Sequence, residues 1–296
     1  MKPDSFSYKI ASGALTVVRR LPLWMLYGIM APIRVVLQHV VGYRKKVVRK
    51  NLRNAFPEKS EKELRKIEKG FYRHLTDVIA ETVKLRGLSD KQLARRIEIA
   101  NPELLNEILS SGVPVVLMVG HIGNWEWMPQ LTMSVNPKVQ FGEIYRKPHD
   151  EGMAKLLHDV RDRWKGVVQI KQDDAVRTIL RWNKEGPWIV GFIADQRPNT
   201  VSLNHWMTFM NQDTPVVIGG ETIARHTGAR TVYMDMEKRK RGRYVISFKD
   251  IVADENSVSE YPVTEKYLTM LEETIRRNPS LWLWSHNRWK YKREKQ

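Results

Sequence analysis

The sequence predicts an α/β fold in which a mainly parallel, mixed sheet is flanked by helices. Three apolar runs, at residues 115–119, 139–144 and 188–193, have the length and composition of short buried strands. Two helical patterns, at residues 153–164 and 175–182, separate the second run from the third. Because strands that alternate with helices usually lie parallel, these patterns favour a parallel sheet.

The later part of the chain continues this pattern and then adds a hairpin. Residues 216–227 read as a further helix, and Gly228 stands where a glycine commonly ends one. Residues 231–236 and 244–248 alternate as strands around a charged loop. Residues 221–228 also resemble the first helix of a DNA-binding helix-turn-helix motif. The strand that follows excludes that motif, because no second helix is left to enter a groove.

The first part of the chain predicts a membrane-associating helical region, residues 1–57, before an α/β domain at residues 58–296. Two apolar segments, residues 10–18 and 21–33, are too short for a simple bilayer span, and no clear signal-peptide cleavage site follows the first. Trp24 and neighbouring arginines suit helices that lie in, or dip into, one leaflet. The alternative is a pair of ordinary core helices.

Composition indicates a globular, strongly basic protein. The 296 residues include 42% hydrophobic ones, carry a formal net charge of +17 and contain no cysteine. A thiol nucleophile, a disulfide and a cysteine-ligated metal are therefore excluded. Basic residues attract anionic lipid headgroups by about 1 kcal/mol each near the surface, and nucleic acid is the general competitor. The basic clusters are Arg44, Lys45, Lys46, Arg49, Lys50 and Arg53; Lys238 to Arg243; and Arg288, Lys290, Lys292 and Arg293.

His121 and Glu126 directly follow the first predicted strand and suggest a general-base pair. Residues five apart in one helix differ by about 140° around its axis, so they would not meet. Pairing therefore requires His121 in the turn and Glu126 on the following helix, with Gly120 and Gly123 permitting the turn and Asn124 capping the helix. The alternative is a solvated histidine and a glutamate that satisfies the helix dipole.

Polar residues also follow the second and third predicted strands. Arg146 follows the second, and Asp195, Gln196 and Arg197 follow the third. Ligands of parallel sheets gather outside the carboxyl ends of the strands, where His121 also falls. The alternatives are a solvated face at Arg146 and a structural ion pair between Asp195 and Arg197.

Taken in order, these motifs resemble the lysophospholipid acyltransferase superfamily. The histidine-x4-acid motif, the Tyr145-Arg146 pair and Asp195-Gln196 after an alanine most resemble the late, secondary acyltransferases of lipid A biosynthesis. Residues 43–57 are similar to the segment that precedes the family's core, and residues 281–289 are similar to its C-terminal signature. Where the family often has a Phe-Phe-Gly-like turn, this chain has Phe-Met-Asn-Gln at residues 209–212.

The resemblance implies a glycerolipid-acyltransferase-like fold and a direct acyl transfer at the cytoplasmic face of a cell inner membrane. An acyl carrier protein would supply the chain and a lipid A precursor would accept it through a hydroxyl. His121 would deprotonate that hydroxyl while Glu126 orients the ring. Arg146 or Arg197 would stabilise the oxyanion, with Asp195 and Gln196 holding the geometry, unless backbone amides of residues 120–124 do so. Direct transfer needs no metal or other cofactor.

Two other functions stay open from the sequence. An acyltransferase with the same residues could act on a glycerophospholipid or another glycolipid. A non-catalytic basic protein that binds membranes or nucleic acid would share the charge, but it would have no need to gather His121, Arg146 and Asp195 around one cleft. The expected partners are the acyl carrier protein, the lipid acceptor and an anionic membrane surface, and nucleic acid is not expected.

Overall fold

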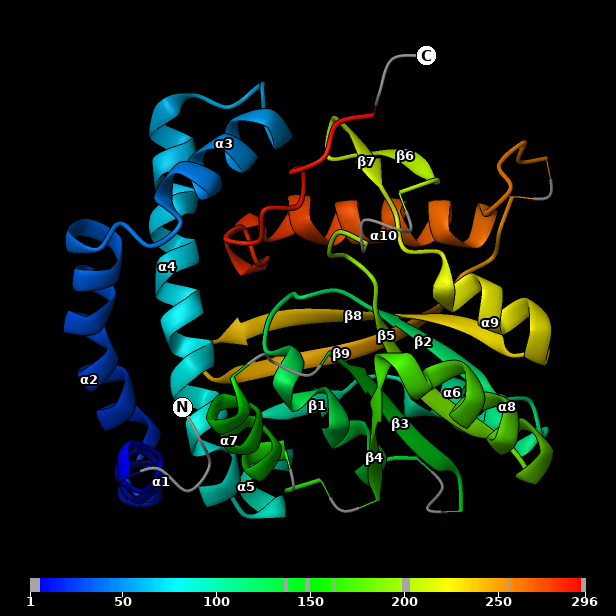
Figure 1. Cartoon of the computed structure of the whole chain (residues 1–296), viewed down its shortest axis with the longest axis horizontal. Helices are drawn as coiled ribbons and strands as arrows, with labels where there is room; N and C mark the ends of the chain where they lie inside the picture. Colours follow the sequence, from blue (N-terminus) through cyan, green and yellow to red (C-terminus); the bar gives the residue numbers. More distant parts are fainter. Residues whose placement is uncertain are drawn as a thin grey trace.

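The computed structural model describes residues 6–135, 138–146, 150–161, 163–164, 166–198, 203–254 and 256–293. Its strands are β1 (Ile97–Ile99), β2 (Val115–Val119), β3 (Gln140–Tyr145), β4 (Val167–Lys171), β5 (Trp188–Ile193), β6 (Trp206–Phe209), β7 (Gln212–Pro215), β8 (Arg230–Lys240) and β9 (Arg243–Asp250). Seven of them form one sheet in the order β1-β9-β8-β2-β5-β3-β4 (Figure 1). β8 and β9 are antiparallel, and every other neighbouring pair is parallel. The predicted mainly parallel, mixed sheet is confirmed.

Helices cover both faces of this sheet. The α-helices are α1 (Phe6–Val18), α2 (Leu23–Val35), α3 (Lys45–Ala55), α4 (Glu61–Lys84), α5 (Asp90–Ala94), α6 (Pro102–Ser110), α7 (Glu151–Arg161), α8 (Ala175–Glu185), α9 (Gly219–Thr227) and α10 (Pro262–Arg277). A π-helical turn, η1, covers Val36–Val40, and 3₁₀ helices cover Leu85–Gly87, Trp125–Met133 (η3), Gln172–Asp174 and Pro279–Leu281. α8, α9 and α10 pack over one face, and α6 packs over the other.

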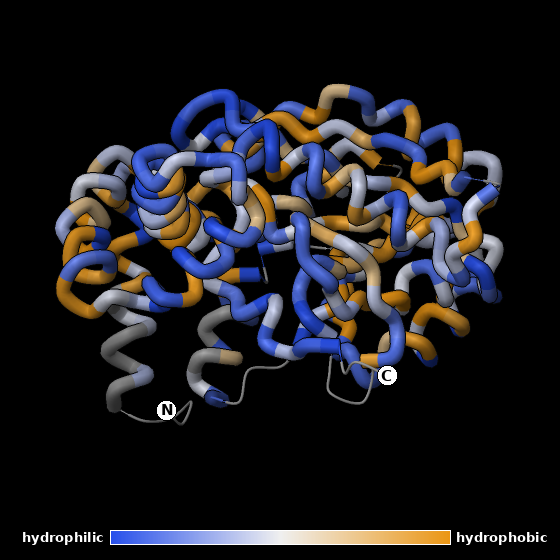
Figure 2. Tube along the Cα trace, turned by 90° about the horizontal axis from the view of Figure 1, so that it is seen from above, coloured by the Kyte–Doolittle hydropathy of each residue, from blue (hydrophilic) through white to orange (hydrophobic). Residues whose placement is uncertain are grey.

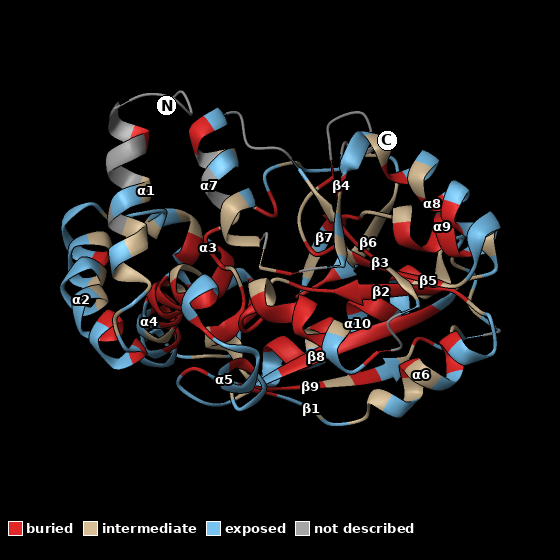
Figure 3. Cartoon of the chain, turned by 90° about the horizontal axis from the view of Figure 1, so that it is seen from below, coloured by how far each residue is buried: buried red, intermediate tan, exposed pale blue. Residues whose placement is uncertain are grey.

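β2 lies near the middle of the sheet because every side chain on it is apolar. All five of its residues are buried, and its neighbours are β5 and β8 (Figure 3). The helices approach it closely: a Cβ added to Gly220 of α9 would lie 2.6 Å from the Met118 sulfur. Burial on both faces is typical of a central parallel strand, which explains its unbroken apolar run.

The predicted strands and the helices between them are found with shifted ends. The second strand, β3, starts at Gln140 and the helix that follows it, α7, ends at Arg161. Between this helix and α8 the chain forms β4, which sequence inspection missed because its residues at Val168 and Gln169 are not fully buried. The hairpin of β8 and β9 is confirmed, and its tip contains Gly242 at φ 68°.

The N-terminal apolar segment is longer than expected. α2 and η1 form one helix of 18 residues, Leu23–Val40, and in the described part of the chain it is the one helix long and apolar enough to cross a membrane by length and composition. From the sequence we expect a charge-free segment that ends at Ile33 and is too short for a simple bilayer span. The helix instead continues through Pro32 and Arg34 into the π-helical turn η1, and this makes it long enough.

α2 has one buried face and one broad exposed apolar face. Leu23, Leu26 and Tyr27 pack with Ala80 of α4 in a cluster separate from the main core. Figures 2 and 3 show α2 at the edge of the molecule, apolar along much of its length and largely exposed. The exposed apolar side chains of α2 and the residues that follow are Trp24, Met25, Ile29, Ile33, Val35, Val36, Val40 and Val41. The predicted domain boundary at residue 57 stays a prediction, and α3, which precedes it, packs in the main core through Val48 and Leu52.

The basic clusters are less uniformly exposed than the sequence suggests. Arg288 is fully buried, so the expectation that it joins a surface cluster is wrong. At the hairpin tip, Lys238 and Arg241 form ion pairs with Asp77 of α4. The cluster on α3 is exposed at Arg44, Lys46, Arg49, Lys50 and Arg53. That helix therefore presents an exposed basic surface, in which Arg49 and Arg53 are paired with Glu68 and Glu61.

The packing of β2 predicts how much a core truncation destabilises the protein. Leu117 is fully buried between Gly191 of β5 and Val232 of β8. We expect Leu117→Ala to lower the free energy of unfolding by about 2–5 kcal/mol, because the transfer free energy is lost and a cavity remains. Leu180→Ala, at a leucine that is 43% exposed, should change it by about 0.5 kcal/mol or less. Urea titrations compare the two, and equal effects would contradict this packing.

Candidate active site

The sheet register brings His121 and Asp195 together. β2 and β5 are parallel neighbours, and Val119 lies beside Ile193. His121 and Asp195 each stand two residues beyond these partners, so the same register places them side by side at the carboxyl edge of the sheet. Both also face the same side, because parallel partners in register do.

The turn that carries His121 requires glycine at two positions. Gly123 has φ 60°, a left-handed conformation in which glycine is unstrained. A Cβ on Gly120 would lie 2.6 Å from the Leu271 side chain of α10. The two glycines therefore serve the turn as predicted, one through its backbone angle and one through close packing.

Asp195 is a buried carboxylate that is fully hydrogen-bonded. Its Oδ1 lies 2.6 Å from His121 Nδ1, and its Oδ2 accepts from the His121 backbone N–H at 2.8 Å and from the Trp282 indole N–H at 2.7 Å. Burial alone would raise the pKa of Asp195, but the His121 ring and these donors hold it below its ordinary value. A charged Asp195 keeps the proton of the ring on Nδ1, so the lone pair stays on Nε2.

The predicted pair of His121 with Glu126 is not formed, and this expectation is wrong. Glu126 opens η3, where Pro129 accompanies a 3₁₀ rather than an α-helical course. Its two carboxylate oxygens accept from Arg161 of α7, Oε2 from Nε at 3.0 Å and Oε1 from Nη2 at 2.8 Å. A bidentate guanidinium is a stronger partner for a carboxylate than a neutral imidazole is, which explains the exchange of partners.

Asn124 does not cap the helix, so that expectation is also wrong. Its side chain makes no capping hydrogen bond and is fully buried. Instead its Nδ2 donates to Glu81 Oε2 of α4 at 2.7 Å. Asn124 therefore fixes the turn to a neighbouring helix rather than starting the next one.

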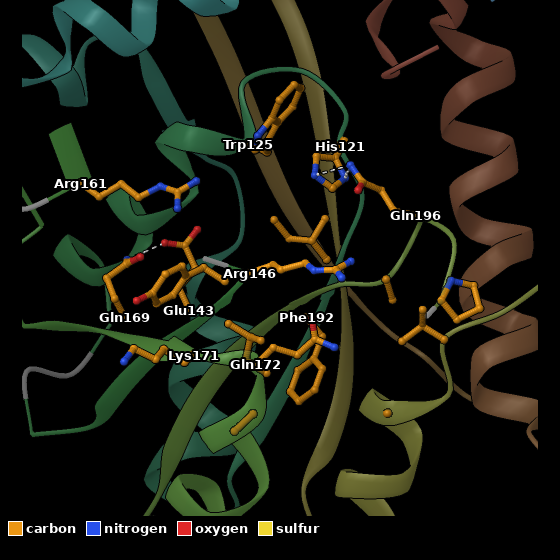
Figure 4. A pocket seen from close by; sticks show the side chains of 18 of the residues that line it. His121, Trp125, Glu143, Arg146, Arg161, Gln169, Lys171, Gln172, Phe192 and Gln196 are labelled. Atoms are coloured by element: carbon orange, nitrogen blue, oxygen red, sulfur yellow. Dashed lines mark hydrogen bonds between the residues drawn. The ribbon is translucent and has the colours of Figure 1, made fainter. Parts of the chain in front are cut away.

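A cavity of about 990 Å³ opens at the carboxyl ends of β2, β5, β3 and β4 (Figure 4). Four of the predicted site residues line it: His121, Arg146, Gln196 and Arg197. Figure 4 shows His121 and Gln196 at one wall and Arg146 extending across the cavity. Among the described residues, Asp195, Asn124 and Glu126 stand outside the lining, where they hold residues that do line it.

The cavity has an apolar part and a polar part. Glu143 in the polar part is 4% exposed and accepts from Gln169 Nε2 at 2.8 Å, and burial raises its pKa. The apolar part is lined by Ile144, Ala175, Val176, Phe192, Ile193, Val217 and Ile223, and the polar part by Glu143, Lys155, His158, Arg161, Gln169, Lys171 and Gln172. Such a lining suits a ligand with a hydrocarbon chain and a polar, anionic head.

Gln196 and Trp125 complete the surroundings of the His121 ring. Gln196 Nε2 lies 3.0 Å from His121 Nε2, where the amide donates to the free lone pair. The Trp125 ring meets the imidazole edge-on, with 5.1 Å between ring centroids. The lone pair of His121 therefore faces the cavity and is occupied by a donor that a substrate hydroxyl can replace.

A family match states the reaction class. The chain matches, over residues 2–291, the family described as bacterial lipid A biosynthesis acyltransferase.

The chain belongs to this family.

A comparison with curated proteins returned no significant match. Membership makes the protein an acyltransferase of the lipid A type, in agreement with the resemblance seen in its motifs. Among the described residues, no cluster of three or more His, Asp or Glu side chains could hold a metal ion.

Two contributors to this acyltransferase site were missed from the sequence. Arg161 had no distinguishing signal, because it is one of 50 basic residues. Trp282 had one, since it lies in the C-terminal segment with the family-like signature, but its partner Asp195 could not be named from spacing. The alternative ion pair of Asp195 with Arg197 is not formed, because His121 and Trp282 occupy the carboxylate.

The C-terminal signature forms an aromatic wall behind Asp195. Trp282 meets Trp284 edge-on at 4.7 Å and Phe209 at 5.9 Å between ring centroids. Arg288 in this segment is fully buried, and none of its three guanidinium nitrogens has a hydrogen-bond partner in the described part of the chain. Burial lowers the pKa of Arg288 to about 10, against the attraction of Asp195.

A buried histidine beneath the turn gives a pH prediction. His74 of α4 meets the Gly123 carbonyl through Nε2 at 3.0 Å and Lys238 Nζ through Nδ1 at 3.3 Å. Burial, followed by the charge of Lys238, lowers its pKa to about 3. Below pH 6.5 the unfolded chain therefore binds a proton at this histidine that the folded chain does not bind. As the pH is lowered from 6.5, the free energy of unfolding decreases by at most about 1.4 kcal/mol per pH unit.

We expect His74→Gln to make that dependence less steep between pH 6.5 and pH 4, because glutamine can still donate to Gly123 but does not titrate. Urea unfolding at a series of pH values measures it. His39→Gln, at an exposed histidine, should leave the slope of the wild type unchanged. A His74→Gln slope equal to that of the wild type would show that His74 is not held neutral.

Proposed function

We propose that the protein transfers a fatty acyl chain from acyl carrier protein to a hydroxyl of a lipid A precursor at a membrane surface. The observation that carries this proposal is the geometry of His121: its Nδ1 meets Asp195, and its Nε2, which meets the Gln196 amide, lies at the wall of a cavity with apolar and polar lining residues. Family membership supplies the reaction class. The residue roles are our inference from this geometry, whereas the donor and the acceptor hydroxyl are inferred from the resemblance of the motifs to the late acyltransferases of lipid A biosynthesis.

His121 acts as the general base, with Asp195 as the acid that orients it. The acceptor hydroxyl replaces the Gln196 amide at Nε2 and gives up its proton as its oxygen attacks the thioester carbonyl carbon. The carbon–sulfur bond then breaks, and the leaving thiolate takes the proton from the His121 imidazolium. Asp195, which is buried beside the ring, stabilises that imidazolium. No covalent bond between enzyme and acyl group is needed.

The developing oxyanion needs donors on the cavity side of His121. Arg146 and Arg197 line the cavity and carry permanent charge. Arg197 is directed by its backbone N–H, which donates to His286 Nε2 at 3.3 Å, and its guanidinium stacks over Tyr291 at 5.4 Å from the ring centroid. A cation near the reacting carbonyl would stabilise the negative charge that develops on its oxygen.

Glu126 enters this proposal as the residue that holds Arg161. The two side chains are 12% and 20% exposed and form a bidentate pair at the polar end of the cavity. Arg161 lines the cavity, and the pair therefore presents part of a guanidinium to an anionic head. Lys155 and Lys171 add positive charge on the same side, as a phosphorylated acceptor and an acidic carrier protein require.

The membrane enters the proposal through α2 and α3. Trp24 is 72% exposed and the neighbouring side chains on that face are apolar, while α3 adds an exposed basic surface. Apolar side chains that enter the lipid and cations that meet anionic headgroups are the two features of an interfacial helix. We place the protein by this face on the cytoplasmic side of the inner membrane.

The direct test of the proposed function is a transfer assay. Wild-type protein is incubated with labelled acyl carrier protein and a lipid A precursor in vesicles, and the lipids are identified by mass spectrometry. We expect one added acyl chain on the precursor. His121→Ala and Asp195→Asn should each lower turnover roughly 10²- to 10⁴-fold, because one removes the base and the other removes the charge that fixes its tautomer.

Matched controls separate chemistry from folding in this assay. His226→Ala and Asp213→Asn change an exposed histidine and an exposed aspartate that lie outside the cavity lining and should keep full turnover. Near-wild-type turnover by either site variant would exclude the mechanism. Transfer to glycerophospholipids but not to the precursor would exclude the proposed acceptor while leaving the base assignment intact.

The pair of Glu126 and Arg161 predicts a non-additive response. We expect Glu126→Gln and Arg161→Gln each to lower kcat/KM, because each leaves the other charge unpaired in a partly buried site. The double variant should be no slower than the slower single variant, since the interaction can be lost only once. Kinetics on all four proteins measure the coupling. Additive losses would show that the two residues act separately.

A further inference from the structure

One buried carboxyl joins three separate elements beside the active site. Glu81 of α4 is fully buried. Its Oε1 accepts from Tyr27 Oη of α2 at 2.7 Å, and its Oε2 accepts from Asn124 Nδ2 at 2.7 Å and Tyr244 Oη of β9 at 2.8 Å. The proposed reaction uses none of these groups, and a glutamate is almost never fully buried unless it is paired, as Glu81 is here.

Asn124 depends on Glu81 for its position. It lies three residues after His121 and directly before Trp125, whose ring borders the His121 imidazole. Its Oδ1 is buried and has no hydrogen-bond partner among the residues that the structure describes. The bond to Glu81 is thus the side-chain contact that fixes Asn124, and loss of it leaves a buried amide unsatisfied.

The same helix also holds the residue before Asn124. His74, two turns earlier on α4, meets the Gly123 carbonyl at 3.0 Å. α4 therefore contacts the turn at two consecutive residues, through the backbone carbonyl of Gly123 and through the side chain of Asn124. A shift of the turn by even 1 Å would move the His121 and Trp125 rings relative to the cavity, and misplacement of that size can lower a rate about 100-fold.

Tyr27 connects these contacts between α4 and the turn to α2. Tyr27 is 8% exposed and bonds to Glu81 of α4, whereas Trp24, three residues earlier on the same helix, is 72% exposed. The buried residues of α2 are Leu23, Leu26 and Tyr27, which pack with Ala80 of α4, and the Arg241 guanidinium lies 3.9 Å from the centroid of the Tyr27 ring. Because several other apolar side chains of α2 are exposed, the docked helix leaves apolar surface in water, which lowers its local stability.

From these contacts we propose that Glu81 is a positioning residue for acyl transfer, which fixes the His121 turn through Asn124. Through its bond with Tyr27, the position of Glu81 in turn depends on whether α2 lies against lipid. This inference rests on the proposed function, in which lipid covers the exposed face of α2. Lipid that binds this face stabilises the docked position of α2, and the docked position is the one in which Tyr27 donates to Glu81. Binding that favours one of two positions shifts the population toward it.

The chain offers a matched pair of variants. Tyr27→Phe removes one buried hydroxyl and its 2.7 Å bond to Glu81. Tyr72→Phe removes a buried hydroxyl of the same helix bundle, bonded at 2.7 Å to the Tyr43 carbonyl, and does not touch the turn. We expect Tyr27→Phe to lower kcat about 10-fold or more with KM unchanged, and Tyr72→Phe to keep both.

Hydrogen–deuterium exchange tests the link without requiring turnover. The probe is a vesicle of phosphatidylethanolamine and phosphatidylglycerol without acceptor. In the wild type and in Tyr72→Phe, vesicles should slow exchange both on α2 and at the amides of residues 121–125. In Tyr27→Phe they should slow exchange on α2 but no longer at the turn.

The outcomes separate this inference from the proposed function. Protection of the turn that persists in Tyr27→Phe, or is absent from the wild type, overturns the link. Equal kcat for Tyr27→Phe and Tyr72→Phe overturns the positioning role. Glu81→Gln keeps the shape of the side chain but removes one hydrogen-bond acceptor, and it should lower kcat at least as much as Tyr27→Phe does. A protein that shows the exchange pattern but transfers no acyl chain supports the link and contradicts the function.

Discussion

The site depends on one constraint: the buried carboxylate of Asp195 must be fully hydrogen-bonded. A buried charge without partners is too costly to keep, so the structure supplies a ring nitrogen, a backbone amide and an indole. Those donors come from the turn after β2 and from the C-terminal segment. Satisfying one carboxylate therefore fixes the His121 ring, closes the turn onto the sheet edge and holds the last part of the chain against the core.

The rest of the cavity follows from the parallel sheet. Strands that run in one direction end at one edge, so residues far apart in the chain, such as His121, Arg146 and Gln196, meet there. α8 and α9 contribute the apolar wall, while α7 contributes cations beside Glu143. The cavity thus has apolar and charged lining residues around His121, and this combination supports the proposed acyl transfer.

Much of the fold could be predicted from local patterns, but the partners of buried charges could not. The unbroken apolar run of β2 indicates a buried strand, and the glycines around His121 indicate a tight turn. From the sequence, Glu126 and Asp195 are both acids that could pair with His121. Glu126 pairs with Arg161 instead, and the position of Arg161 depends on the tertiary packing of α7, which local patterns do not reveal. Arg288 looked like surface charge because burial of a guanidinium leaves no trace in sequence. His121 and Asp195 each lie two residues beyond paired positions of β2 and β5. If that register had been known, it would have suggested the bond between them.

In the proposed mechanism Asp195 keeps the proton of His121 on Nδ1, so that the lone pair on Nε2 is directed toward the cavity and the Gln196 amide. Nitrogen-15 NMR of the eight histidine rings, with His121 assigned by comparison with His121→Gln, observes this tautomer directly. We expect a protonated Nδ1 and an unprotonated Nε2 at neutral pH in the wild type, and loss of that preference in Asp195→Asn. A His121 ring protonated on Nε2 in the wild type would contradict the account.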